Sequence, residues 1–236
     1  TAFAQIPKRQ QSKVLEFVNK FRTDPRSSGI NYERINAARD KNLRSVRIDN
    51  TYRGIVMKPE DGNAYLLLWV DHHDKAYEWA KDRRCDINPE TGCIQVYVVD
   101  EVLAPAEALT VEQPCLFNGI RDREFLRLGV PEPQLELIKR IHAIDDLESL
   151  KDSLPVDCVE ALTFLAQGDP LEEVLTLIDS YKGNTTHVDI EDFATALHNP
   201  ISLQKFSVDP SEQELEAMLR APLEKWRVFL HPSQRY

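Results

Sequence analysis

The stretch "LRSVRIDNTYRGIVMK", Leu43 to Lys58, alternates apolar and polar residues on both sides of a short polar segment. β-branched and aromatic residues in this alternation are typical of strands with one buried face. The next apolar run, "NAYLLLWV" (63–70), follows "PEDGN", whose Asp61–Gly62 pair is a hairpin-turn signal. The runs "LRSVRID", "YRGIVMK" and "NAYLLLWV" therefore predict a three-stranded antiparallel sheet.

Helical patterns flank these strands. Residues 8–22, "KRQQSKVLEFVNKFR", carry apolar side chains at helical spacing on one face, and "HHDKAYEWAKDRR" after the third strand returns to the same spacing. Two further short strands are expected at 85–87 and 93–99, around the turn "NPETG". Residues 1–99 therefore predict a small α+β domain.

The rest of the chain is helical in pattern. Residues 100–115 are rich in Ala, Pro and Glu without periodicity, which indicates a linker. In residues 116–236 the apolar spacing is helical throughout, as in "DPLEEVLTLIDS". Gly129, Gly168 and Gly183 stand where helices are expected to end. The predicted fold class is α+β with a small antiparallel sheet, followed by an all-α helical domain.

Charge divides the chain in the same way. Residues 1–84 contain 17 Lys and Arg against 11 Asp and Glu, whereas residues 85–236 contain 12 against 28, for a net charge of −10 in 236 residues. A basic half attracts phosphate backbones, while an acidic half maintains solubility or shields the basic face. The alternative is that both sets of charges are ordinary solvated surface.

Several classes of protein are excluded or disfavoured. No apolar run approaches the roughly 20 residues of a membrane span, and the start lacks the apolar core of a secretory signal, so we expect a cytoplasmic protein without a membrane partner. The four cysteines have no metal-site spacing, and buried free thiols are favoured over a Cys85–Cys93 disulfide. No metal site is expected. No phosphate-binding glycine motif is present, so this chain alone should not hydrolyse ATP.

Basic and aromatic residues around the sheet suit a phosphodiester. Guanidinium groups bind phosphate oxygens bidentately, and an imidazole transfers protons near neutral pH. His73 shares a helix face with Tyr77, four residues later. The alternative interpretation is that "HHD" only caps the helix, with Asp71 as the N-cap. The candidate catalytic residues are Arg47, Arg53, His72 and Tyr77.

In residues 1–84 the order helix, "LRSVRIDNTYRGIVMK", hairpin and "AYLLLWVDHHDKAYEWA" resembles the RelE/ParE-type toxin fold. The resemblance implies that Arg47 and Arg53 match the basic residues of the strands, His72 the histidine of the strand end, and Tyr77 the late tyrosine. RNA-cleaving members of that family cut messenger RNA in the ribosomal A site. The sequence departs from the family at His73 and Asp74, where arginines are common, and at Ser45, where lysines are expected.

The last segment, "LEKWRVFLHPSQRY" (223–236), resembles the Q motif of UvrD/Rep-like superfamily 1 helicases through Leu230, Pro232, Gln234 and Arg235. A glutamine amide can pair with the N6 and N7 edge of adenine, which makes Gln234 and Arg235 candidate nucleotide-binding residues. In that family a phosphate loop follows roughly 20 residues later. The resemblance implies that ATP and Mg belong only to the complete helicase, whose downstream domains would be partners in the same chain.

The leading hypothesis is an accessory N-terminal fragment of an ATP-dependent DNA helicase that binds nucleic acid, DNA or RNA, or a protein partner. An alternative is a RelE-type endoribonuclease toxin with a fused acidic domain that neutralises it. A third is a scaffold without nucleic-acid contact. The residues expected to contact phosphates are Lys41, Arg44, Arg47, Arg53 and Lys58.

Overall fold

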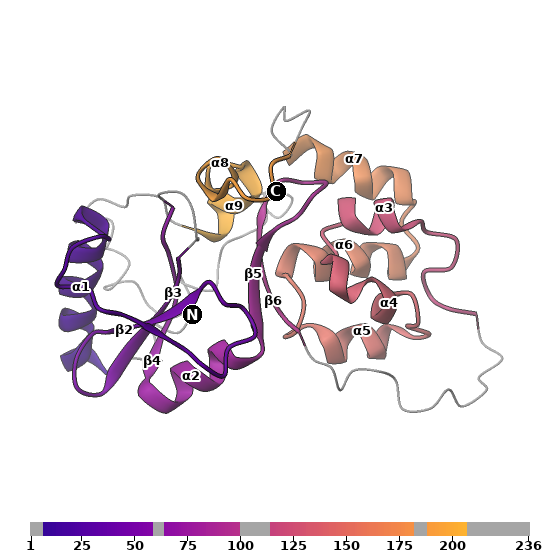
Figure 1. Cartoon of the computed structure of the whole chain (residues 1–236). Helices are drawn as coiled ribbons and strands as arrows, with labels where there is room; N and C mark the ends of the chain where they lie inside the picture. The colour runs from indigo at the N-terminus through magenta and orange to yellow at the C-terminus, as the bar shows by residue number, and fades with distance from the viewer. Residues whose placement is uncertain (1–6, 59–63, 100–113, 182–187, 207–236) are drawn as a thin grey trace. The chain divides into compact units, whose positions relative to one another are not determined.

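The chain folds as a mixture of helices and small antiparallel sheets (Figure 1). The ranges described by the computed structural model are 7–58, 64–99, 114–181 and 188–206. Most of the predicted linker, residues 100–113, lies outside these ranges.

Two compact units divide the chain. The first comprises Thr1–Lys81 with Gln204–Tyr236, and the second comprises Asp82–Leu203. The sequence placed the end of the first domain at residue 99, whereas the division in the structure follows Lys81. The segment 82–99 therefore groups with the helices that come after it.

The first unit contains a four-stranded antiparallel sheet in the order β1-β2-β3-β4. The prediction of three strands is right for β2, β3 and β4, and β1 is the additional strand. β1 has only three residues and no apolar alternation, so its sequence gives no strand signal. The elements are α1 (Lys8–Thr23), β1 (Tyr32–Arg34), β2 (Leu43–Arg47), β3 (Tyr52–Met57), β4 (Leu66–His72) and α2 (His73–Lys81).

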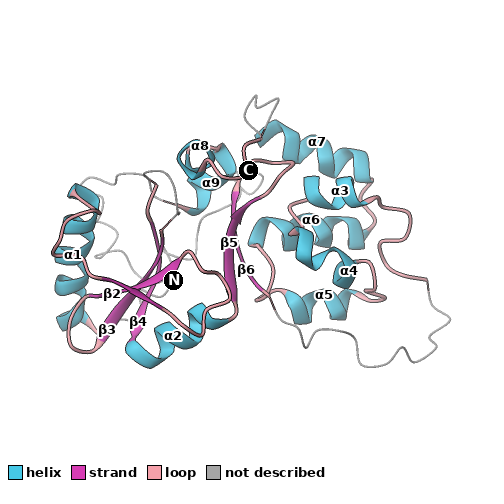
Figure 2. Ribbon diagram, viewed as in Figure 1, coloured by secondary structure: helices cyan, strands magenta, loops and turns pink. Residues whose placement is uncertain are grey.

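The helix α1 packs on one face of this sheet (Figure 2). Its buried residues include Phe17 and Phe21, which share a core with Val46 of β2 and Val56 of β3. Successive residues of a strand point to opposite faces, so the apolar positions of β2 and β3 that face α1 alternate with those that do not. The predicted amphipathic helix at 8–22 is confirmed.

The other face of the sheet carries Ile55 of β3 and its partner Trp69 of β4. Trp69 stacks on Trp79 of α2, with 5.1 Å between ring centroids and 10° between the planes. This stack and the buried Ala76 and Ala80 place α2 against the sheet.

Gly54 of β3 lies under the apolar layer formed with α1. A Cβ atom at this position would be 2.9 Å from Cγ2 of Val46 and 3.0 Å from Cδ1 of Leu67. Val46 is fully buried and β-branched, so it has little freedom to move away. We expect Gly54→Ala to lower the free energy of unfolding of the first unit by about 1–3 kcal/mol, measured by urea unfolding followed by tryptophan fluorescence.

Ser45→Ala is the matched control, because it places the same methyl group in the same sheet. Ser45 is fully buried and its hydroxyl has no hydrogen-bond partner among the described residues. Removing an unsatisfied buried hydroxyl is neutral or stabilising. Equal losses of stability in both variants would contradict the explanation by close packing at Gly54.

The second unit joins one hairpin to a group of short helices (Figure 1). Residues Val174 and Leu175 of the predicted helix "DPLEEVLTLIDS" are buried as expected. The elements are β5 (Arg83–Ile87), β6 (Ile94–Val98), α3 (Asp122–Arg127), the 3-10 helix η2 (Glu132–Gln134), α4 (Leu135–Ile138), α5 (Ile144–Leu150), α6 (Val156–Gln167), α7 (Leu171–Tyr181), α8 (Phe193–Leu197) and the start of α9 (Pro200–Lys205). The unit that holds the helices is therefore not purely helical.

Cysteines and helix-ending glycines follow the sequence prediction. None of the four cysteines forms a disulfide, so the prediction of thiols instead of a Cys85–Cys93 disulfide is confirmed. Cys85, Cys93 and Cys158 are buried as predicted, whereas Cys115 is only half-buried. Gly129 and Gly168 have φ values of 88° and 101°, in the left-handed region that a helix end favours. Gly183 lies outside the described residues.

Buried amides connect the hairpin to the helices. Asn88, at the turn after β5, donates from Nδ2 to the carbonyl of Leu126 at 2.9 Å, and Gln95 of β6 donates from Nε2 to the carbonyl of Gly129 at 2.6 Å. Both side chains are 1% exposed. Buried polar groups that are fully bonded favour one arrangement of the elements that they join. These contacts explain why the hairpin groups with the second unit.

Candidate nucleic-acid interface

The two units carry opposite charge. Residues 1–81 contain 15 Lys and Arg against 10 Asp and Glu, an excess of five positive charges. Residues 82–203 contain 9 against 24, an excess of 15 negative charges. For binding an anion, the important property is how many of these cations already have a carboxylate partner.

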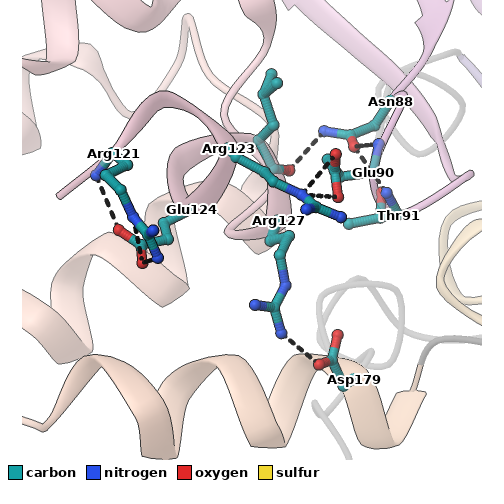
Figure 3. Close-up of polar contacts among 9 residues, drawn as sticks. Asn88, Glu90, Thr91, Arg121, Arg123, Glu124, Arg127 and Asp179 are labelled. Carbon is teal, nitrogen blue, oxygen red and sulfur yellow. Dashed lines mark hydrogen bonds and ion pairs between the residues drawn. The ribbon is translucent and has the colours of Figure 1, made fainter.

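Arginines in and next to α3, in the acidic unit, are each matched by a carboxylate. Arg123, for example, approaches Glu90 with 3.2 Å between Nε and Oε1. These contacts are exposed and each contributes little to stability, but they neutralise the cations of this segment. The three pairs are Arg121–Glu124, Arg123–Glu90 and Arg127–Asp179 (Figure 3).

The cations of the four-stranded sheet are bonded differently. In five of these six residues the donors contact neutral acceptors or an aromatic ring, and no carboxylate oxygen of the described residues lies within 4.0 Å of the charged nitrogen atoms of any of the six. The positive charge of the sheet is thus largely uncompensated. The residues concerned are Arg34, Lys41, Arg44, Arg47, Arg53 and Lys58.

Arg47 and Arg53 share a hydrogen-bond acceptor, and we call them the arginine pair. They are directly opposite each other on β2 and β3. The carbonyl oxygen of Asp49 accepts from both, from Nε of Arg47 at 3.3 Å and from Nη1 of Arg53 at 2.9 Å. Nη2 of Arg47 also donates to Asn50 Oδ1. Two guanidinium groups therefore converge on one carbonyl.

Like charges directly opposite each other destabilise a sheet, and the Asp49 carbonyl offsets part of that repulsion. Nη1 of Arg47 and Nη2 of Arg53 have no hydrogen-bond partner among the described residues. Each guanidinium group carries five N–H donors in a planar fork that matches a phosphate. The arrangement is suited to an anion with several oxygen atoms.

The turn between β2 and β3 fixes the position of the pair. The carboxylate of Asp49 accepts the N–H groups of Thr51 and Tyr52, both at 2.7 Å, and lies 3.6 Å from Nζ of Lys13 on α1. Burial raises the pKa of Asp49, but these two hydrogen bonds and the Lys13 ammonium outweigh burial, so its pKa lies below the ordinary value. The carboxylate of Asp49 is therefore already hydrogen-bonded to the backbone of its own turn.

The other predicted phosphate contacts lie away from the arginine pair. Arg44 lies three residues before Arg47 on β2, so its side chain points to the opposite face of the sheet. Arg44 is directly opposite Arg34 of β1. Lys58 lies over the ring of Tyr32, 5.2 Å from its centroid, and Nζ of Lys41 donates to the carbonyl of Ala38 at 2.9 Å. The five predicted residues thus form two sets: the arginine pair near the β2–β3 turn, and Lys41, Arg44 and Lys58 toward the other end of β2.

The predicted catalytic residues are only partly brought together. Asp71 of β4 is directly opposite Arg53, so the next residue, His72, points to the other face. There His72 packs on Tyr52, with 4.5 Å between ring centroids. The helical pattern included His72, whereas the resemblance placed it at the end of a strand, and it is the last residue of β4. This separation from the arginine pair gives the endoribonuclease hypothesis no support.

His73 and Tyr77 stack as their spacing predicted, with 4.5 Å between centroids and 23° between the planes. The helix-capping alternative is wrong in its detail, because the Asp71 carboxylate accepts the N–H of His72 and not one of α2.

Sequence reasoning missed the parts played by Lys13 and Asp49. The polar segment "DNT" was a signal for the turn, whereas nothing local pointed to Lys13.

The nucleotide-binding candidates Gln234 and Arg235 lie outside the described residues. In the part of the chain that the structure describes, no group of three or more His, Cys, Asp or Glu is placed to hold a metal ion. None of the helices in the described ranges has the length and apolar character that crossing a membrane requires.

No protein-family model, curated protein or solved structure matches this chain.

Proposed function

We propose that the first unit binds the phosphate backbone of nucleic acid and that the chain is an accessory N-terminal module of a UvrD/Rep-like ATP-dependent DNA helicase. One observation carries the binding proposal. The arginine pair has unpaired N–H donors and no carboxylate partner among the described residues, whereas the arginines at α3 are neutralised.

Such a pair recognises phosphate and not base sequence. A guanidinium fork donates two parallel hydrogen bonds to one phosphate, and every nucleotide presents the same group. Binding by this unit is therefore independent of sequence, and each phosphate that is neutralised releases counterions. The acidic second unit keeps the whole chain at a net charge of −10, which limits binding to the sheet surface.

The helicase part of the proposal rests on the Q-motif-like residues Leu230, Pro232, Gln234 and Arg235. ATP and Mg would bind downstream helicase domains, and this module would not hydrolyse ATP itself. A RelE-like fold for the first unit belongs to the same proposal. It is supported by α1 on one face of an antiparallel sheet and α2 after its last strand. Helices from residue 116 onward would form the second part of the module.

Salt dependence tests the binding proposal. We expect fluorescence anisotropy to detect binding of a labelled single strand or its duplex at about 50 mM salt. If the arginine pair neutralises about two phosphates, affinity should fall about tenfold between roughly 50 and 200 mM salt. Absence of binding to both probes at the lower salt concentration would overturn the proposal and leave a protein-interaction role.

A further inference from the structure

We infer that the first unit binds a nucleic-acid fork, in which two strands leave a duplex, with one strand on each face of the four-stranded sheet. This inference rests on the proposed function and adds the class of ligand. It follows from a second group of cations on the face opposite to the arginine pair, which also lacks a carboxylate partner among the described residues. We call Arg34, Arg44 and Lys58 the opposite-face cations.

The register of the sheet places the two groups of cations on opposite faces. Arg44 and Arg47 are three residues apart on β2, so their side chains point to opposite faces. Arg34 is directly opposite Arg44 and shares its face. Lys58 lies over the ring of Tyr32, which is two residues before Arg34 on β1 and so belongs to that face as well.

Both groups are accessible to a ligand. Each contains one exposed arginine, Arg47 in the pair and Arg34 among the opposite-face cations. Lys58 is half-buried, and its Nζ lies 5.2 Å from the centroid of the Tyr32 ring. An ammonium group has three donors, and a ring on one side leaves donors for a phosphate on the other. The tyrosine ring thus positions Lys58 without neutralising it.

A duplex on its own can contact only one of the two groups. The face of the opposite-face cations also carries α1, and the face of the arginine pair carries α2. A sheet with a helix on each face has three layers, each about 10 Å thick, whereas a major groove is about 12 Å wide. The sheet therefore cannot enter a groove. Two strands that diverge from a duplex can pass on either side of it.

A fork benefits from contact with both faces at once. We expect the first strand to bind the arginine pair, whose two guanidinium groups converge on one carbonyl. Asp71 is directly opposite Arg53, and its carboxylate reduces the attraction of this face for phosphate. Once that strand is bound, the other strand of the fork is held close to the opposite face, so its binding becomes intramolecular. Linkage of this kind can raise affinity by about 10²–10⁴-fold, so weak contacts of the opposite-face cations become significant.

The test compares three DNA probes at about 50 mM salt: a fork with two single-stranded arms of about 12 nucleotides, a duplex with one such arm, and a fully paired duplex with as many phosphates as the fork. We expect the protein to bind the fork at least roughly tenfold more tightly than either other probe. The one-armed probe contains the same junction, so it shows whether the second strand matters.

An Arg34→Gln/Lys58→Gln variant should bind the fork and the one-armed probe about equally, while its affinity for the one-armed probe stays near that of the wild type. Glutamine removes the charge and keeps a polar side chain with an aliphatic stem. Arg34→Lys/Lys58→Arg keeps both charges and should keep the preference for the fork. The control Lys139→Gln/Arg140→Gln removes two cations of the second unit that contact carboxylates, and it should also keep the preference.

The outcomes separate this inference from the proposed function. Equal affinity of the wild-type protein for the fork and the one-armed probe would overturn the inference and leave the proposed function in place. A preference for the fork that persists in Arg34→Gln/Lys58→Gln would overturn it too, because the preference would not depend on the opposite-face cations. Absence of binding to all three probes would overturn both.

Discussion

Replacement of Arg47 and Arg53 together by alanine is expected to weaken DNA binding about tenfold at roughly 50 mM salt. The reason is that the two guanidinium groups converge on the Asp49 carbonyl and leave N–H donors without partners among the described residues. The slope of log affinity against log salt should become shallower by about 1.4 for a single strand, because about two phosphates are no longer neutralised. Fluorescence anisotropy over a salt series measures both quantities.

A matched control changes the same charge elsewhere. Arg121→Ala/Arg123→Ala removes two arginines that are already bound to Glu124 and Glu90. We expect its affinity for DNA to stay near that of the wild type. An equal loss in both double variants would mean that net charge, and not the position of the arginine pair, governs binding.

The lysine variant Arg47→Lys/Arg53→Lys separates charge from geometry. Lysine keeps the positive charge but lacks the planar fork that binds two phosphate oxygens. Its affinity should lie between those of the wild type and the double alanine variant. Far-ultraviolet circular dichroism of each variant checks that the sheet is retained.

Asn88→Ala is expected to lower the free energy of unfolding of the second unit by about 2–4 kcal/mol. Asn88 Oδ1 accepts the backbone N–H groups of Glu90 and Thr91 at 2.9 and 2.8 Å, and Nδ2 donates to the carbonyl of Leu126 at 2.9 Å. Thr91 is 2% exposed, so its N–H would lose its partner where water has little access. Differential scanning calorimetry measures the shift of the second unit's transition.

The control for this prediction is Asn118→Ala, which removes an exposed asparagine of the same unit. A surface change of this kind usually alters stability by less than about 0.5 kcal/mol. If Asn88→Ala were as mild as the control, the buried amide contacts would not be what holds the hairpin to the helices.

Local patterns in the sequence were enough to predict β2, β3, β4 and α1, because each buries one face and so repeats with its own period. The same alternation placed Arg47 and Arg53 together across a short turn. β1 could not be predicted, since its residues "YER" have no apolar alternation and its pairing depends on β2.

The face occupied by His72 depends on register and not on composition. The register between β3 and β4 shifts at Ile55/Val56, and a shift of one residue reverses the face of every side chain beyond it. Likewise, no local pattern in the sequence indicated that the β5–β6 hairpin groups with the second unit. It depends on Gln95 and Gly129, which are 34 residues apart and carry no local signal.

The β5–β6 hairpin decides where the basic unit can be separated from the rest of the chain. A polypeptide that ends at residue 99 would keep the hairpin but lose Ser153, whose carbonyl accepts the N–H of Val98, and Gln134, whose amide donates to the carbonyl of Val98. Those exposed strand groups would be free to pair with other molecules and promote aggregation. Expression of the four-stranded sheet with its two helices, without the hairpin, should therefore stop at Lys81.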